Sequence, residues 1–286
     1  MANPVSITMP NGLTTRWLDT GSATDEPPIL LLHGLAASIE AWEPVIPILA
    51  ARRRVAAFDL PGFGEAEKPD ATYDPAFFVA QLGAALDYLG APRVHLIGSS
   101  MGASLLARAA PTLGDRFASA TLLAPGGFGR WVHPFLRVPT MPVLGGLLAT
   151  PNRATAAFAV RLAIANPAVK TAPLVALQDR LSRLPGAKRA FVRTLRGFAS
   201  PLGMTGRAGF EADAQALTAP TLLVWGRQDR IFPCQRSRRA AVVLPNLVRT
   251  EVLEPCGHYP QIDQPEVTAA LIEEHLARAE AIIPPR

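Results

Sequence analysis

The stretch VHLIGSSMG, residues 94–102, decides the fold of this chain because it encodes a strand, a sharp turn and a helix in close succession. An apolar run ends at Gly98, and Ala- and Leu-rich sequence follows Gly102. A residue between two such glycines takes strained backbone angles, and residues without a Cβ let strand and helix approach there. We therefore expect Ser100 at a helix N-terminus with an accessible hydroxyl, where backbone N–H groups favour a developing anion.

A single Gly-x-Ser-x-Gly motif arises by chance in a chain rich in small residues, but its context here gives it weight. An apolar run leads into His33 and Gly34 before the motif. Asp229 follows a late apolar run, and His258 lies near the C-terminus. A serine, an acid and a histidine thus occur in the order of a hydrolase triad.

These motifs and their order resemble the α/β-hydrolase family of serine hydrolases, over nearly the whole chain. The segments that carry the resemblance are LLLHG (30–34), DLPGFG (59–64), GSSMG (98–102), LVWGRQD (223–229) and GHYP (257–260). The resemblance implies an α/β-hydrolase fold, with about eight mostly parallel strands, flanking helices and an inserted helical cap over the serine. Within the family, carboxylesterases and meta-cleavage-product hydrolases are the most similar subgroups.

Hydrophobic runs alternate between short strands and longer helices, which is typical of a parallel sheet with crossover helices. Strands are predicted at 5–8, 15–18, 29–32, 54–58, 94–97, 119–123, 221–225 and 248–252, and helices at 41–51, 75–89, 101–112, 235–243 and 265–279. Residues 127–210 interrupt the alternation with proline-rich helical patterns. We expect residues 1–126 and 211–286 to form the hydrolase core and residues 127–210 the cap, or lid.

Composition indicates a folded protein, since 286 residues allow one large core and 49% are hydrophobic. The N-terminus lacks the basic and apolar regions of a secretory signal, and the apolar stretch 143–160 is too interrupted to span a membrane. Cys234 and Cys256, the only cysteines, are expected as reduced thiols. We expect a cytoplasmic protein with no transmembrane segment.

Basic residues concentrate in the predicted cap. Residues 127–210 contain 12 Lys or Arg but a single acid, Asp179. This asymmetry could steer anionic substrates, seat the cap on an anionic membrane surface, or simply form a solvated helical face. The basic residues are not interleaved with aromatics, so we predict no nucleic-acid binding in spite of a pI of about 9.8.

Acyl transfer needs a nucleophile, a base, a group that orients the base and donors for the oxyanion. We assign these roles to Ser100 as nucleophile, His258 as general base and then acid, and Asp229 as the orienting carboxylate. The family resemblance implies that the backbone N–H groups of Leu35 and Met101 form the oxyanion hole, with His33 and Gly34 shaping the first loop.

Other histidines and acids are set aside by position. His95 is predicted inside a core strand, while His133 and His275 fall in the cap and the last helix. Glu254 is the other acid near the histidine, but it lies on the histidine's own segment. Asp229 follows a strand and should lie at the carboxyl edge of the sheet, where ligands bind in such folds.

Ester hydrolysis through an acyl-enzyme is the favoured function, with a small-molecule substrate held by an apolar pocket under a basic cap. The alternative is carbon–carbon bond hydrolysis of anionic meta-cleavage dienoates. Ser99 and Ala103 depart from that subgroup, which usually carries Asn and Gly at these positions. A receptor or scaffold with little turnover is a third hypothesis, since a fold alone does not establish function.

Substrate contacts and cofactors complete the predictions. Gly34, Ser99 and Tyr259 are candidate substrate contacts, and Arg189 and Arg193 are a candidate clamp for a substrate carboxylate. The sequence contains no metal-ligand spacing and no dinucleotide motif after a strand, so we predict no metal and no cofactor.

Overall fold

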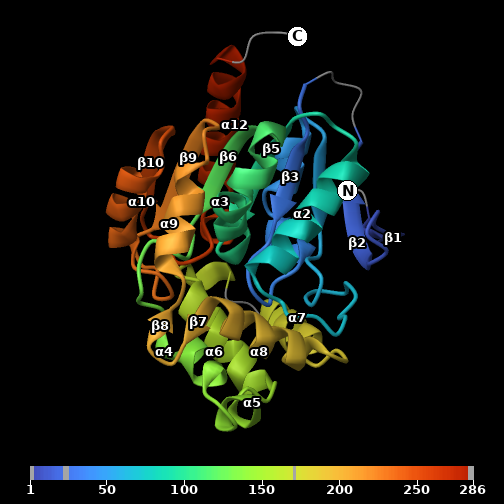
Figure 1. Cartoon of the computed structure of the whole chain (residues 1–286), viewed down its shortest axis with the longest axis vertical. Helices are drawn as coiled ribbons and strands as arrows, with labels where there is room; N and C mark the ends of the chain where they lie inside the picture. Colours follow the sequence, from blue (N-terminus) through green and yellow to red (C-terminus); the bar gives the residue numbers. More distant parts are fainter. Residues whose placement is uncertain (1–2, 22–25, 170–171, 283–286) are drawn as a thin grey trace.

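An eight-stranded sheet forms the centre of the computed structural model, which describes residues 3–21, 26–169 and 172–282 (Figure 1). The strand order is β1-β2-β4-β3-β5-β6-β9-β10; β2 pairs antiparallel with both β1 and β4, and the six strands from β4 to β10 in this order pair in parallel. The strands are β1 (Val5–Thr8), β2 (Thr14–Asp19), β3 (Ile29–Leu32), β4 (Val55–Phe58), β5 (Val94–Ser99), β6 (Phe117–Leu123), β9 (Thr221–Gly226) and β10 (Leu247–Leu253). The predicted mostly parallel sheet is confirmed.

Helices cover both faces of this sheet, so its central strands are buried throughout and mostly apolar. In β4, Ala56 and Phe58 join the core on one face, and Val55 and Ala57 join the core on the other. The first face is covered by α2 (Pro75–Leu89), α3 (Met101–Leu113), α9 (Arg207–Gln215) and α10 (Ser237–Val243). The second is covered by α1 (Ile46–Ala50) and α12 (Pro265–Ile282).

Local sequence explains where the helices begin and end. Asp74 caps α2 by accepting a hydrogen bond from the Phe77 N–H, and Gly90 ends the helix at a φ of 72°. The helix predicted at 41–51 is instead a 3₁₀ turn, Ile39–Trp42, followed by α1. Pro47 lies in the first turn of α1, and its ring would clash with a preceding helical turn, so one continuous helix cannot form.

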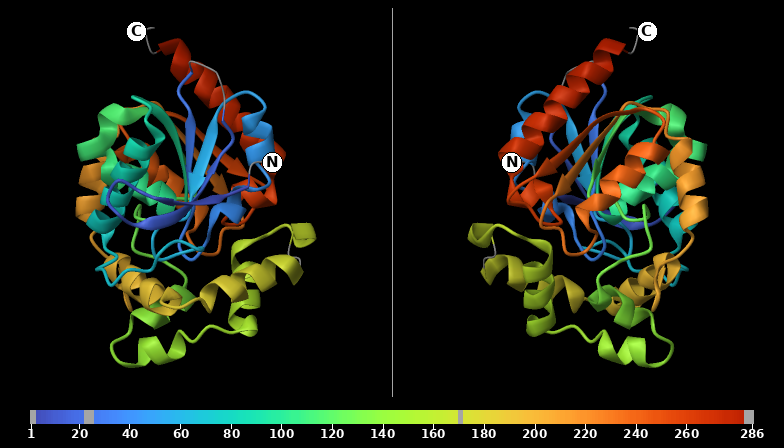
Figure 2. Two further views of the ribbon diagram at one scale, coloured as in Figure 1. Left: turned by 90° about the vertical axis from the view of Figure 1, so that its right-hand side faces the viewer. Right: turned by 90° about the vertical axis from the view of Figure 1, so that its left-hand side faces the viewer.

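Between β6 and β9 the chain leaves the sheet and builds a group of helices, the helical insert of residues 127–210. Both views of Figure 2 place it at one end of the sheet. It contains α4 (Pro134–Arg137), α5 (Leu144–Leu148), α6 (Arg153–Ala163), α7 (Ala172–Ser182) and α8 (Ala187–Phe198), then the short strands β7 (Ala199–Ser200) and β8 (Gly203–Met204). Further short elements are 3₁₀ turns at Gly114–Arg116, Val138–Thr140, Pro167–Val169 and Cys234–Arg236, and α11 (Pro260–Asp263).

The predicted boundary at residue 210 falls inside α9 and needs correction at this point. Helix α9 packs on α3 of the core, where Arg108 of α3 bonds Asp213 at 2.7 Å and lies over the Phe210 ring. Phe210 also contacts Phe128 edge-on in the main core. These contacts of Phe210 hold the end of the insert against the core, and α9 packs on the sheet as a core helix.

Two smaller expectations concern thiols and membrane spans. Cys234 and Cys256 are buried free thiols, and burial raises the pKa of Cys256 so that it stays protonated. Within the described ranges, no helix combines the length and apolar character needed to cross a bilayer.

Candidate active site

The turn between β5 and α3 holds Ser100 in a strained conformation, with φ 55° and ψ −114°. Glycine is required at both flanking positions because other backbone atoms approach closely there. A Cβ on Gly98 would lie 2.5 Å from the Ala103 nitrogen, and one on Gly102 would lie 2.2 Å from the Leu32 carbonyl oxygen. The GSSMG motif therefore presents Ser100 at the start of α3, as the sequence indicates.

His258 bridges Ser100 and Asp229. The three residues come from three separate turns or loops of the chain. His258 Nε2 lies 2.8 Å from Ser100 Oγ, and His258 Nδ1 lies 2.8 Å from Asp229 Oδ2. A carboxylate only accepts hydrogen bonds, so Nδ1 carries the imidazole proton and Nε2 is left to accept from the serine hydroxyl. All three side chains are buried, so water competes little with these bonds.

The Asp229 carboxylate is held by several donors besides His258. Its Oδ1 accepts from the backbone N–H groups of Ile231 and Phe232 at 2.8 and 2.9 Å, and its Oδ2 accepts from Trp225 Nε1 at 3.1 Å. Glu254, the other acid considered, is exposed and bonds Gln228 instead. The structure thus brings Asp229, and not Glu254, to the imidazole.

The loop after β3 approaches the serine from the other side. A Cβ on Gly34 would lie 3.0 Å from Ser100 Cβ, so a larger residue would push the loop away. His33 fixes this loop: its Nδ1–H donates to the Gly34 carbonyl and its Nε2 accepts from the Leu60 N–H, both at 2.8 Å. Burial lowers the pKa of His33, which keeps the ring neutral and suited to both bonds.

Leu35 and Met101 lie on this side of the serine and both line the cavity beside Ser100. Among the hydrogen bonds of the described chain, the backbone N–H groups of these two residues donate to no protein acceptor. Both donors are therefore available to an oxygen bound next to the serine hydroxyl.

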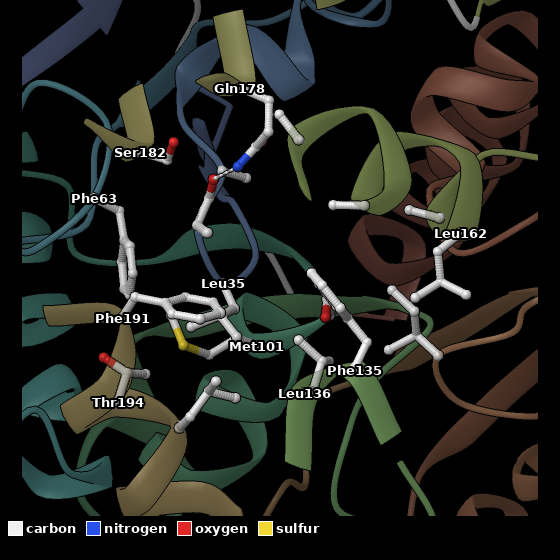
Figure 3. Close-up of a pocket in the computed structure, with 18 of the residues that line it drawn as sticks. Leu35, Phe63, Met101, Phe135, Leu136, Leu162, Gln178, Ser182, Phe191 and Thr194 are labelled. Atoms are coloured by element: carbon white, nitrogen blue, oxygen red, sulfur yellow. Dashed lines mark hydrogen bonds between the residues drawn. The ribbon is translucent and has the colours of Figure 1, made fainter. Parts of the chain in front are cut away.

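A cavity of about 370 Å³ lies between Ser100 and the helical insert. Its wall is mostly apolar: Figure 3 shows Leu35, Met101 and Phe191 on one side, and Phe135, Leu136 and Leu162 on the other. Gln178 of α7 donates to the Ala36 carbonyl at 3.3 Å and so joins the insert to the loop after β3. The polar residues of the wall are Ser38, Glu40, Ser100, Ser104, Thr150, Thr155, Gln178, Ser182, Lys188, Thr194, His258 and Tyr259.

The predicted substrate contacts are only partly placed in this cavity. Tyr259 lines it, and burial raises the pKa of its phenol to about 12, so the phenol stays protonated. Ser99 is fully buried behind the wall, where its hydroxyl accepts from Gln261 Nε2 at 3.1 Å. Gly34 lies behind Ser100 and acts through its small size instead.

Arg189 and Arg193 are not in the cavity wall, which corrects the predicted carboxylate clamp. Arg189 donates to the Lys68 carbonyl at 3.0 Å, and Arg193 donates to the Ala71 carbonyl at 2.9 Å and pairs with Asp70. The helical repeat explains the error, because α8 turns another stripe to the cavity. That stripe is Ala187, Lys188, Phe191, Thr194, Leu195 and Phe198.

Asp263 is a residue of the site that sequence reasoning missed. Its carboxylate accepts from the backbone N–H groups of Gly257, Ala165 and Asn166 at 2.6, 3.1 and 2.8 Å. It thereby joins the histidine loop to the insert, where the His258 N–H also donates to the Ala163 carbonyl. The available signal was an isolated acid in α11, a few residues after the GHYP motif.

The other histidines considered lie away from the serine. His95 bonds Ser119 across the sheet at 2.8 Å, and burial lowers its pKa. His275 donates from Nε2 to the Pro220 carbonyl at 3.2 Å, and burial lowers its pKa to about 4. His133 caps α4 in the insert. The three histidines lie where the sequence places them, in a core strand, in the insert and in the last helix.

Known proteins share both the sequence and the fold. Residues 27–265 match the family described as alpha/beta hydrolase fold. The chain is 31% identical over 268 residues to a 2-hydroxymuconate semialdehyde hydrolase of Pseudomonas putida, and the match covers 89% of each protein. It is 30% identical to the dihydrolipoyllysine-residue acetyltransferase component of an acetoin cleaving system from Pseudomonas putida; that match covers 89% of this chain but spans only 64% of the relative's length. A solved membrane phospholipase A, described as a bacterial virulence factor, is similar with a TM-score of 0.80 and 26% identity, covering 98% of this chain and 87% of its own.

Proposed function

The chain belongs to the α/β hydrolase fold family and is a hydrolase, and we propose that it cleaves carboxylic esters through an acyl-enzyme on Ser100. One observation carries the proposal: the hydrogen-bond chain from Ser100 through His258 to Asp229 opens into an apolar cavity. Such a chain supplies a nucleophile and a correctly protonated base in one place.

In the first half-reaction, Ser100 Oγ attacks the ester carbonyl carbon while His258 Nε2 takes the hydroxyl proton. The carbonyl oxygen becomes an oxyanion within reach of the Leu35 and Met101 N–H groups, at the N-terminus of α3. Loss of one such donor typically costs about 3 to 4 kcal/mol of transition-state stabilisation. His258 then gives its proton to the leaving alkoxide, and the acyl group stays on Ser100.

In the second half-reaction, a water molecule takes the place of the alcohol. His258 Nε2 accepts its proton as the water oxygen attacks the acyl carbon, and the same proton returns to Ser100 Oγ as the acid departs. Asp229 keeps the imidazole in one orientation and stabilises the imidazolium in both halves. The proton that leaves with the alcohol is thus replaced by one from the attacking water, and Ser100 and His258 return to their starting protonation states.

The cavity favours a small or medium-sized apolar substrate. Its volume of about 370 Å³ is near the lower end of the usual range for small-molecule sites. Phe135, Leu136, Leu162 and Phe191 give apolar contact for an acyl or alcohol chain. Gln178 and Thr194 are among the polar residues of the wall that could orient a ligand.

Carbon–carbon bond hydrolysis is the second candidate, and the 31% identity to a 2-hydroxymuconate semialdehyde hydrolase favours it. The same serine and histidine would serve such a reaction. A dienoate carboxylate, however, needs a cationic partner. Among the described residues of the cavity wall, Lys188 is the one cation, and Arg189 and Arg193 bind the core instead. We therefore rank ester hydrolysis first.

Steady-state turnover of p-nitrophenyl esters of increasing acyl length, with a meta-cleavage dienoate in parallel, tests the proposal. We expect ester turnover by the wild type and a loss of at least about 10³-fold in Ser100→Ala. Ser99→Ala is the matched control, because that neighbouring hydroxyl lies behind the wall; it should retain activity within about tenfold. Dienoate turnover with feeble ester activity would reverse the ranking, and no turnover of either would support a binding protein.

A further inference from the structure

Helix α5 lies at the end of the molecule remote from the C-terminal end of α12 (Figure 1), and large apolar side chains on and beside this helix are exposed. Val143, Leu147 and Leu148 are 85%, 68% and 60% exposed. Val143 precedes α5, and the two leucines lie in its last turn. We name these three residues the α5 tip. Three large apolar side chains exposed within six residues make this segment a candidate interaction surface.

Two cations lie beside the segment that carries α5, and two more are close to it in sequence. Arg196 of α8 donates to the Met141 carbonyl at 3.2 Å, and Lys188 donates to the Thr150 hydroxyl at 3.4 Å, so both lie beside the segment that carries α5. Arg137 and Arg153 lie close by in sequence, on either side of it. In the described part of the chain, none of these four cations pairs with a carboxylate.

Several other basic residues of the insert pair with acids. Arg180 pairs with Glu65 at 2.6 Å, and Arg193 pairs with Asp70, so both hold the insert against core loops. Asp179, the one acid of residues 127–210, pairs with Arg183. Among the described insert cations without a carboxylate partner, Lys188 and Arg196 lie beside α5 and Arg153 follows it in sequence, while Arg130, Arg161 and Arg189 lie elsewhere in the insert.

We propose that the α5 tip is a docking surface for an anionic phospholipid membrane. Val143 and Leu147 would enter the boundary between headgroups and acyl chains, and Arg153 and Arg196 would contact lipid phosphates; Arg137 is instead held by the Val132 carbonyl and the Trp131 ring. Apolar burial combined with cationic contacts is the arrangement by which proteins lie on such surfaces.

Charge complementarity favours a lipid surface over a second copy of this chain. A symmetric dimer formed through the tip would place the same patch against itself. The cationic rim of one protomer would then face the cationic rim of the other, and no described acid lies in the rim to offset the repulsion. An anionic membrane satisfies both the apolar tip and its rim.

The tip is continuous with the cavity, which gives docking a consequence for the proposed function. Leu148 belongs to the tip and also lines the cavity, together with Ala149, Thr150 and Pro151. If the protein cleaves apolar esters, as proposed above, a docked tip would receive them from the lipid phase. The docking itself does not depend on hydrolysis.

Binding to vesicles tests the docking surface. The full chain would be co-sedimented with vesicles of phosphatidylcholine alone or with roughly one quarter phosphatidylglycerol. We expect a partition coefficient at least about tenfold higher on the anionic vesicles, falling as salt screens the charges. Ser100→Ala should bind as well as the wild type, so that a failure of docking and a failure of catalysis remain distinguishable.

Two variants separate the tip from general surface effects. The double variant Val143→Asp, Leu147→Asp should lose at least about tenfold in partition. The matched control Val242→Asp, Arg238→Glu changes a 76% exposed valine and an exposed arginine on α10, and should leave binding unchanged.

Turnover of a soluble ester and thermal unfolding show whether the tip variant is folded, since neither Val143 nor Leu147 lines the cavity. Equal binding to neutral and anionic vesicles would overturn the proposal. So would full binding by the tip variant in its folded form. Light scattering that showed a dimer, dissociated by the tip variant, would assign the surface to self-association instead.

Discussion

Asp229→Asn replaces a carboxylate with an amide of the same shape, and the surrounding donors decide how the amide turns. Oδ1 of Asp229 accepts from the Ile231 and Phe232 N–H groups. An NH₂ group on that side would face two donors, so the amide oxygen stays there and the NH₂ turns towards His258. The Trp225 indole loses one acceptor but keeps the Phe232 carbonyl at 2.9 Å.

The turned amide changes the tautomer of His258. Facing an N–H donor, Nδ1 must accept, so the imidazole proton moves to Nε2. Nε2 then cannot accept the Ser100 proton, although the atoms stay about 2.8 Å apart. The same substitution in a serine-protease triad lowers kcat about 10⁴-fold, and we expect a loss of about 10³ to 10⁴ here, or about 4 to 5 kcal/mol.

The assay is kcat on a p-nitrophenyl ester near neutral pH, with thermal unfolding of each variant. Asp229→Asn should keep the fold, because every backbone hydrogen bond to the side chain is retained. Glu254→Gln is the control: this acid is near His258 in sequence but exposed, and its variant should match the wild type. A fall of less than about tenfold in a folded Asp229→Asn protein, or an equal fall in Glu254→Gln, would refute the reasoning.

Two further predictions concern the loop after β3 and the acid stability of the fold. Gly34→Ala should lower kcat/KM about 10- to 100-fold, because the new Cβ would lie 3.0 Å from Ser100 Cβ and displace the loop. Leu35→Ala is the control for Gly34→Ala, because it retains the backbone N–H. A kcat/KM equal to that of the wild type for Gly34→Ala in the same ester assay would contradict the proposal that the loop after β3 must lie close to Ser100. Burial lowers the pKa of His275 from 6.5 to about 4. Between these two values the unfolded state binds more protons than the folded state, so the free energy of unfolding decreases as pH falls from 6.5 to 4, by up to about 3 kcal/mol. Urea unfolding across this pH range should show a shallower loss for His275→Gln; an equal slope in both proteins would contradict the effect.

Local sequence determined the elements of the core and the candidate site residues. The helix predicted at 75–89 has those bounds, since Asp74 and Gly90 specify its ends through short-range hydrogen bonds and backbone freedom. The GSSMG motif likewise predicts the position of Ser100, because strand, glycine and helix signals are contained within nine residues. Asp229 and His258 follow from the family's order of motifs, and the structure brings both to the serine.

The tertiary structure alone decided which side chains reach the cavity. Arg189 and Arg193 have the charge of a carboxylate clamp, yet α8 packs with Phe191 and Leu195 inward and turns both arginines to the core loops. The spacing of apolar residues along a helix indicates which residues share a face. Which face meets the cavity and which meets the core depends on the elements against which the helix packs. Asp263 was missed for the same reason. Two of its three donors, Ala165 and Asn166, precede it by 98 and 97 residues, and the third, Gly257, precedes it by 6. Local chemistry can be read along the chain, whereas contacts between distant segments exist only after the core has brought those segments together.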